Sequence, residues 1–155
     1  MTAKQYLGTL KRLDFIIRQK TEELEDLKSK SKSIKSIDYS NERVDKSKNT
    51  DAPFTKIIEN IIDLSNDIAK DIETLISQKH MIINQIQELK NDLFVEILYK
   101  RYVRFERLEQ IAVDMNYDYT YIRQLHGQAL CSFEKNHTFL KDTTKSYTIL
   151  HSNML

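Results

Sequence analysis

Two stretches of the chain carry apolar residues at alternating steps of three and four, the spacing of one face of an α-helix. In about the first thirty residues this stripe comprises Tyr6, Leu10, Leu13, Ile17, Leu24 and Leu27. Thr2 and Gln5 stand just before it with the spacing of a capping box. The pattern predicts an amphipathic helix whose opposite face, rich in Lys and Glu, is typical of the solvated flank of a coiled coil.

The second stripe consists of isoleucine and leucine and is interrupted only by Ser65 and Lys79. Its members are Ile58, Ile61, Ile68, Ile72, Leu75, Ile82, Ile86 and Leu89. Asp51-Ala52-Pro53 places a proline in the first turn, so the helix is expected to begin at residue 51 and to run to about residue 89.

A polar segment separates the two stripes. Residues 29–51 lose the helical period and are rich in Ser, Lys, Asn and Asp, whose side chains compete for backbone hydrogen bonds, so a loop is expected there. Because neither stripe can be buried alone, residues 1–90 are predicted to form a helical hairpin or an oligomerisation region. We expect a homodimer through the N-terminal helices, although the pattern fits pairing within one chain equally well.

Three shorter helices are predicted after the capping pair Asn91-Asp92, over residues 93–105, 107–115 and 119–135. Their apolar faces comprise Leu93, Ile97, Leu98, Tyr102 and Phe105, then Leu108, Ile111, Ala112 and Met115, then Ile122, Leu125, Ala129 and Phe133. These faces suit a three-helix unit over residues 91–135. The expected fold class is therefore all-α, a long N-terminal coiled-coil-like hairpin followed by a C-terminal helix-turn-helix unit.

The last residues, 136–155, have no sustained period and are expected to form a loose tail. Within that tail, Tyr147, Ile149 and Leu150 could dock on a partner.

The junction between the second and third short helices carries local signals of a tight turn. Ala112 is small enough to let a crossing helix approach, and Asn116 tolerates the left-handed backbone conformation that ends helices. Asp118 stands where the next helix needs an N-cap acceptor, and Tyr117 is expected to plug the corner.

Composition supports a helical protein and argues against several function classes. Two glycines and one proline in 155 residues do not suit turn-dense β folds or Gly-rich phosphate loops. The single Cys131 and four scattered histidines have no metal-ligand spacing, and no catalytic triad or dyad converges by spacing. We therefore expect no metal, no cofactor and no enzyme activity. No apolar run or leader-like N-terminus suggests a membrane, so a cytoplasmic protein is expected.

With a net charge of only +1, the chain has no broad positive electrostatic field. Any contact with nucleic acid must therefore depend on a local surface, with help from dimerisation or a partner.

Residues 108–130, LEQIAVDMNYDYTYIRQLHGQAL, resemble the helix-turn-helix in the fourth region of bacterial sigma factors, the part that reads the upstream promoter element. The matching positions are Leu108, Glu109, Ile111, Ala112, Tyr117, Asp118, Ile122, Arg123, Gln124, Ala129 and Leu130. Residues 98–103, LYKRYV, are similar to the first helix of that region. The sequence departs from the family at Asn116, where a glycine is customary, at Arg107, where a capping Ser or Thr is usual, and at Gly127 and Gln128.

With its heptad-rich N-terminal part and the opening AKQYLGTLKRLD, the whole chain resembles phage-encoded transcriptional activators of the ArpU and RinA type. The resemblance implies a sequence-specific DNA-binding regulator, an activator of late genes of a phage or mobile element, acting in a bacterial host cell. Double-stranded DNA and host RNA polymerase are the implied partners.

In such a unit the helix over 119–133 enters the major groove with its N-terminal residues toward base edges. Tyr119, Thr120, Arg123 and Gln124 point away from the apolar face, and arginine and glutamine can bond guanine and adenine bidentately.

Further candidate contacts flank this surface. Tyr121 and Gln128 suit phosphate or thymine methyl groups. A basic cluster near the first two short helices suits backbone contacts; its members are Lys100, Arg101, Arg104 and Arg107.

Two other functions remain open from the sequence. Small terminase subunits, which recognise DNA for packaging, also combine a helix-turn-helix with oligomerising helices. Alternatively, the unit could be an adaptor that binds RNA polymerase and never touches DNA.

Overall fold

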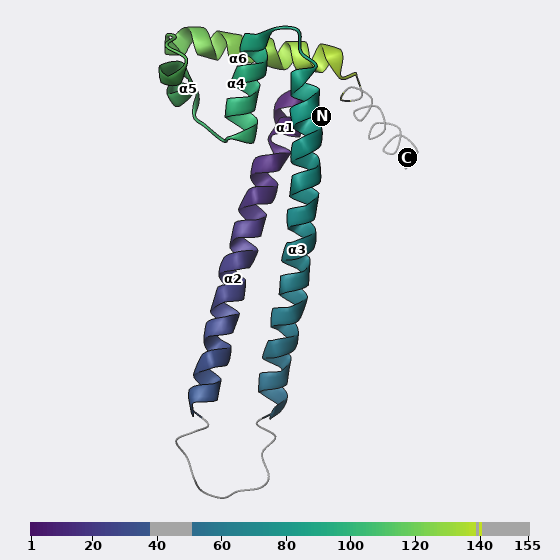
Figure 1. Cartoon of the computed structure of the whole chain (residues 1–155), viewed down its shortest axis with the longest axis vertical. Coiled ribbons are helices and arrows are strands. Elements are labelled where there is room, and N and C mark those ends of the chain that lie inside the picture. Colours follow the sequence, from purple (N-terminus) through teal and green to yellow (C-terminus); the bar gives the residue numbers. More distant parts are fainter. Residues whose placement is uncertain (38–50, 139, 141–155) are drawn as a thin grey trace, which may run out of the picture. The chain divides into compact units, whose positions relative to one another are not determined.

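The computed structural model describes residues 1–37, 51–138 and 140, and this part of the chain contains helices and no strands. The all-α fold class is therefore confirmed. The helices are α1 (Ala3–Leu7), α2 (Thr9–Ile37), α3 (Asp51–Gln87), α4 (Asp92–Leu98), the π-helix η1 (Tyr99–Val103), α5 (Leu108–Asp114) and α6 (Tyr119–Asn136) (Figure 1). Among the helices in these ranges, none has both the length and the apolar character required to cross a bilayer.

The chain divides into two compact units. The first unit combines Met1–Arg12 with the described residues from Ile76 onward, and the second unit consists of residues 13–75. This division differs from a sequence-based boundary at residue 90. The reason is that the first residues of the chain and the end of α3 pack with the later helices, a long-range contact that helical periodicity cannot reveal.

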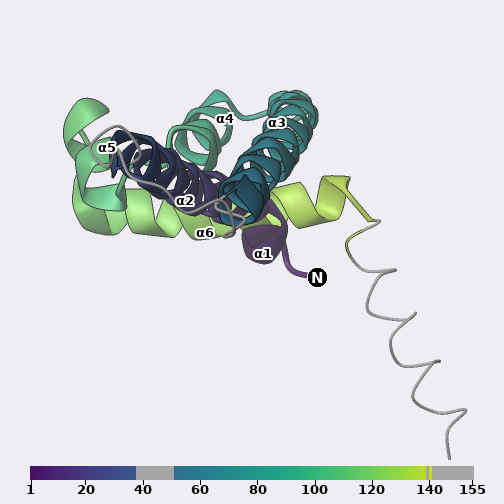
Figure 2. The same ribbon diagram turned by 90° about the horizontal axis from the view of Figure 1, so that it is seen from below.

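In the first unit, α6 contacts α1, α4 and α5 (Figures 1 and 2). A buried cluster joins three of these helices and consists of Ile97, Ile111, Ala112, Ile122 and Leu125. Partly buried side chains pack around it, namely Leu93, Phe94, Leu108 and Met115. Burial at these positions confirms the predicted inward faces, except that Phe94 also contributes. The cluster holds α6 by one face and leaves the opposite face open.

The N-terminus is an integral part of this first unit. The backbone N–H of Ala3 donates to Oε1 of Glu134 on α6 at 2.8 Å, and the Tyr6 hydroxyl donates to Oε1 of Gln85 at 2.9 Å. The Tyr6 ring lies 6.3 Å from that of Phe133. The predicted capping box is confirmed, since the side chains of Thr2 and Gln5 each accept from the other residue's backbone N–H.

In the second unit, residues 13–37 of α2 and 51–75 of α3 run side by side in opposite directions within one chain (Figure 1). Lys20 Nζ donates to Asp71 Oδ2 at 2.6 Å, and this hydrogen bond raises the pKa of Lys20. Leu24 and Ile68 are buried there. The apolar stripes on α2 and α3 therefore have a partner within the same molecule.

The expectation of a loop beginning at residue 29 is wrong as far as residue 37, because α2 continues to Ile37. The Ser33 hydroxyl donates to the carbonyl oxygen of Ser29 at 3.2 Å, so here a serine bonds back along its own helix. Ser31 is buried. The remainder of the predicted loop, residues 38–50, lies outside the described residues.

The predicted tail also begins later than expected. His137 and Leu140 are buried, and His137 Nε2 forms a hydrogen bond with the carbonyl oxygen of Gln85 at 3.2 Å. The candidate docking residues Tyr147, Ile149 and Leu150 lie outside the described residues.

Candidate nucleic-acid interface

The turn between α5 and α6 is closed by backbone hydrogen bonds. Asn116 has φ 56°, and its N–H donates to the carbonyl oxygen of Val113 at 3.1 Å. The N–H of Tyr117 donates to the carbonyl oxygen of Ala112 at 2.9 Å. This pair of bonds is the Schellman arrangement, which satisfies the last carbonyls of a helix and requires one residue in the left-handed region. The prediction for Asn116 is confirmed.

Helix α6 starts where its N-cap was predicted. Asp118 has extended backbone angles, and its carboxylate accepts from the N–H of Thr120 at 2.8 Å. Ala112 is buried in the α5–α6 contact, as expected for a small residue at a close crossing. Tyr117 does not plug the corner, because its side chain is 41% exposed and lies against the Tyr121 ring at 5.3 Å. Its ring packs against Tyr121 in the first turn of α6 instead of entering the core.

The first two turns of α6 present the predicted base-reading side chains to solvent. Tyr119, Thr120, Arg123 and Gln124 are all exposed. The buried residues of α6 are Ile122, Leu125, Ala129 and Phe133. Tyr121 is exposed as well. These side chains therefore leave the helix on the side away from the core and are accessible to a partner.

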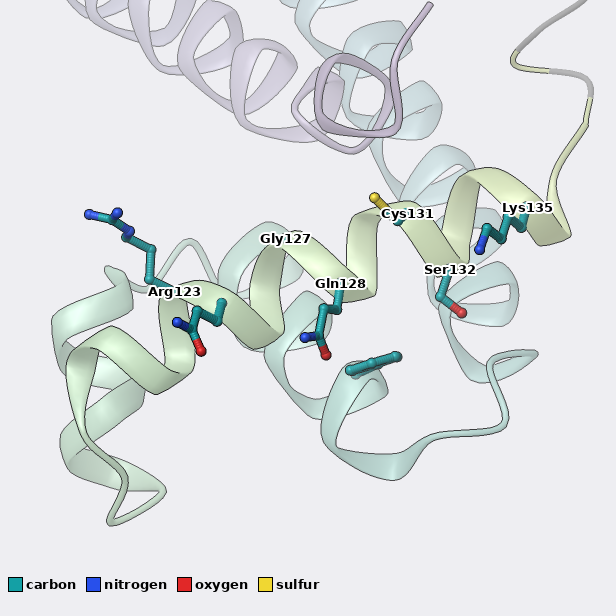
Figure 3. Close-up of a pocket in the computed structure, with 8 residues that line it drawn as sticks. Arg123, Gly127, Gln128, Cys131, Ser132 and Lys135 are labelled. Atoms are coloured by element: carbon teal, nitrogen blue, oxygen red, sulfur yellow. The ribbon is translucent and has the colours of Figure 1, made fainter.

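A groove continues this surface toward the C-terminal end of α6. It has a volume of about 730 Å³, and three predicted contacts line it, Arg123, Gln124 and Gln128 (Figure 3). Arg123 extends from α6 on the other side from Gln128, so the two side chains border the groove from different directions. The remaining lining residues were not predicted from the sequence; they are Phe94, Gly127, Cys131, Ser132 and Lys135. Spacings of three, four and seven residues along α6 relate most of them to Gln124 and Gln128, and this could have identified them.

The residues of the basic cluster are not all available to a partner molecule, because three of them make contacts within the protein. Lys100 has a side chain only 16% exposed and lies 3.7 Å from a carboxylate oxygen of Glu96 and 3.8 Å from one of Asp114. Arg101 donates to the carbonyl oxygen of Glu106 at 2.8 Å, and Arg104 contacts the Glu106 carboxylate at 2.9 Å. These three cations already have partners within the first unit.

The π-helix η1 explains why these cations gather at one place. Its wider turn ends in Phe105, which has φ 60°, and the N–H of Glu106 then donates to the carbonyl oxygen of Lys100 at 3.0 Å. The chain therefore doubles back, so that Glu106 lies beside Arg101 and Arg104. Single π-helical turns are frequent at functional sites, and this one directly precedes α5.

Arg107 is the N-cap of α5 and makes no capping hydrogen bond with its side chain. Replacing Arg107 by serine is expected to raise the free energy of unfolding by about 1 kcal/mol, because a serine hydroxyl can accept from an otherwise unpaired N–H. Urea denaturation of the full chain measures the change. A variant no more stable than the original chain would show that this helix end is already satisfied by solvent.

A comparison of the chain with protein-family models, with curated proteins and with solved structures gave no match.

Proposed function

We propose that this chain is a sequence-specific DNA-binding transcription regulator whose α6 reads the major groove. By its resemblance to the ArpU and RinA type, it is an activator of phage or mobile-element genes in a bacterial cell. The observation that carries the proposal is the exposed row at the start of α6, with Arg123 and Gln124 held outward by a buried opposite face. Arginine and glutamine are the side chains best suited to bidentate contacts with guanine and adenine.

Gly127 adds support from the middle of the same exposed face. A glycine inside a helix costs about 0.5–1 kcal/mol relative to alanine. A Cβ at Gly127 would meet nothing within 4 Å, so no packing within the described chain requires its absence. A close approach by a partner molecule would account for a glycine at this position.

Replacing Gly127 by alanine is expected to raise the free energy of unfolding by about 0.5–1 kcal/mol. Replacing it by leucine should keep the fold and weaken DNA binding, because the larger side chain would hold α6 away from the groove. Thermal unfolding and a DNA titration of both variants test this pair of expectations. Undiminished DNA affinity in the leucine variant would show that Gly127 does not lie in the interface with DNA.

The decisive experiment selects bound duplexes from a random library at low salt, using the original chain and an Arg123→Ala, Gln124→Ala variant. The original chain should enrich a consensus, and the variant should lose about tenfold or more in affinity for it, since each bidentate contact contributes about 1–3 kcal/mol. A matched control is the Gln87→Ala, Lys90→Ala variant, which removes the same kinds of side chain from exposed positions outside α6.

Two outcomes would count against the proposal. No enriched sequence with either protein would favour the adaptor that binds RNA polymerase. Equal loss in the Gln87→Ala, Lys90→Ala control would mean that the effect is not specific to α6. A steep fall in affinity with added salt should accompany genuine DNA binding, because bound cations release the counterions of DNA.

The homodimer is part of the same proposal. Ile62 and Ile72 on α3 remain 53% and 41% exposed in the single chain, so a second copy could cover them. Dimerisation would raise the effective concentration of a weakly charged DNA-binding unit without new base contacts. The mass of the protein in solution distinguishes these two hypotheses. A dimer fits the regulator, and a ring of many copies fits a small-terminase-like packaging protein.

A further inference from the structure

A second cavity in the first unit lies where α1, the start of α2, η1 and α6 meet. Its volume is about 410 Å³, within the range of small-molecule sites. Four cationic side chains line it, contributed by Lys4, Lys11, Arg101 and Arg123. No acidic residue is among its lining residues. Residues from both ends of the described chain therefore place an excess of positive charge around one cavity.

These cations are not neutralised by ion pairs. Among the described residues, Lys4, Lys11 and Arg123 form no salt bridge, and Arg101 bonds to a backbone carbonyl rather than to a carboxylate. Four like charges, none of them paired with a carboxylate in the described part of the chain, repel one another around the cavity, and an anion bound among them would relieve that repulsion.

The wall of the cavity adds aromatic surface to this charge. The Tyr102 and His126 rings are stacked with centroids 5.8 Å apart and share a hydrogen bond of 3.1 Å between the hydroxyl and Nε2. Phe105 lines the same cavity. Burial lowers the pKa of His126, and the nearby charges of Arg101 and Lys4 lower it further.

We propose that this cavity binds a nucleotide, with its phosphates among the four cations and its planar base against Phe105 and Tyr102. Charge-assisted bonds from lysine and arginine are the usual means of holding phosphate, and aromatic faces accept planar bases. Arg123 lines both this cavity and the groove along α6. An occupied cavity would therefore compete with DNA for Arg123, which would make the nucleotide a regulator of binding.

Calorimetric titration of the full chain with pyrophosphate, ADP and GDP, without DNA, tests the inference. We expect pyrophosphate to bind, and ADP or GDP to bind more tightly. The Lys4→Glu, Lys11→Glu variant should lose about tenfold or more in affinity for all three ligands, as expected from the loss of charge-assisted bonds. Lys90→Glu makes one such charge reversal at an exposed lysine outside the cavity and should change affinity less than about twofold.

Two further variants separate the parts of the site. Phe105→Gly removes the ring where φ is 60°, a conformation that glycine adopts freely, and should weaken ADP binding while leaving pyrophosphate binding intact. Bound phosphate would favour protonated His126, which strengthens binding as the pH falls from about 7 to about 5. The terminal phosphate of the ligand takes up a proton at about pH 6, in the same range, so the contribution of His126 is the difference between the original chain and His126→Gln at each pH. The other charged or titratable groups that line the cavity with His126 are Lys4, Lys11, Arg101, Tyr102 and Arg123. His126→Gln should reduce this pH dependence.

The same cations could instead hold a phosphate of a DNA strand, and a duplex titration of the same variants distinguishes the two sources. No binding of any free ligand at millimolar concentration would overturn the inference, as would an equal loss of affinity in Lys90→Glu. Loss of duplex binding alone in the Lys4→Glu, Lys11→Glu variant would assign the cavity to the DNA backbone. Because the nucleotide titration contains no DNA, its failure would leave the proposed function standing.

Discussion

Replacing both Leu7 and Leu10 by alanine is expected to lower the free energy of unfolding of the first unit by about 4 kcal/mol or more. Both side chains are fully buried, and each buried leucine shortened to alanine costs about 2–5 kcal/mol. Since whole domains have free energies of unfolding of only about 5–15 kcal/mol, the double variant should be close to unfolding at room temperature. Urea denaturation measures the change, and amide hydrogen exchange on α6 shows whether that helix loses protection.

The control for this variant is Arg12→Ala, an exposed change in the same part of α2, which should alter stability by less than about 0.5 kcal/mol. If α6 kept its exchange protection in the leucine double variant, the first twelve residues would not contribute to the stability of the rest of the first unit.

Phe133→Ala is expected to cost about 3–5 kcal/mol, the range for a phenylalanine removed from a core. Phe133 is fully buried, and its ring centroid lies 6.3 Å from that of Tyr6 and 4.4 Å from that of His137. Its loss should therefore release α1 and the residues after α6 together. Thermal unfolding measures the stability, and hydrogen exchange at α1 shows the local effect.

Lys135→Ala, two residues further along the same helix and exposed, is the matched control and should change stability by less than about 0.5 kcal/mol. A loss below about 1 kcal/mol in Phe133→Ala would indicate that neighbouring side chains close the cavity and that this contact does not hold the unit together.

Local chemistry made much of the fold predictable. The helix starts follow from side chains that cap backbone N–H groups within three residues, as at Thr2, Asn91 and Asp118. The left-handed Asn116 follows from the few residue types that adopt that conformation. Inward faces follow from the 3.6-residue period, because burial in a helical protein selects apolar side chains on one face.

Features set by distant parts of the chain were not predictable from the sequence. The period runs through Gly8, yet α1 ends at Leu7, and Ala3 and Tyr6 are held by residues far along the chain. The π-helical turn at 99–103 has no sequence signal of its own. The serine-rich composition of residues 29–37 led to the wrong prediction of a loop. Serine hydroxyls can form hydrogen bonds inside a helix, as Ser33 does, as well as hydrogen bonds that compete with helix formation.

The candidate interface likewise has features that could be predicted from the sequence and features that could not. Exposure of Arg123 and Gln124 follows from their offset from Ile122 on the helix and was expected. The partners of Lys100 and Arg101 depend on how η1 turns and on where α5 lies, so a basic run alone could not show that these two cations are already engaged.

The exposed thiol of Cys131 gives this chain a built-in position for a spectroscopic probe. It is the sole cysteine in the sequence, and it is one of the residues that line the groove along α6. A maleimide dye would therefore attach at one place without any engineered substitution. Its emission would register any molecule that enters this groove, and fluorescence could follow binding in real time.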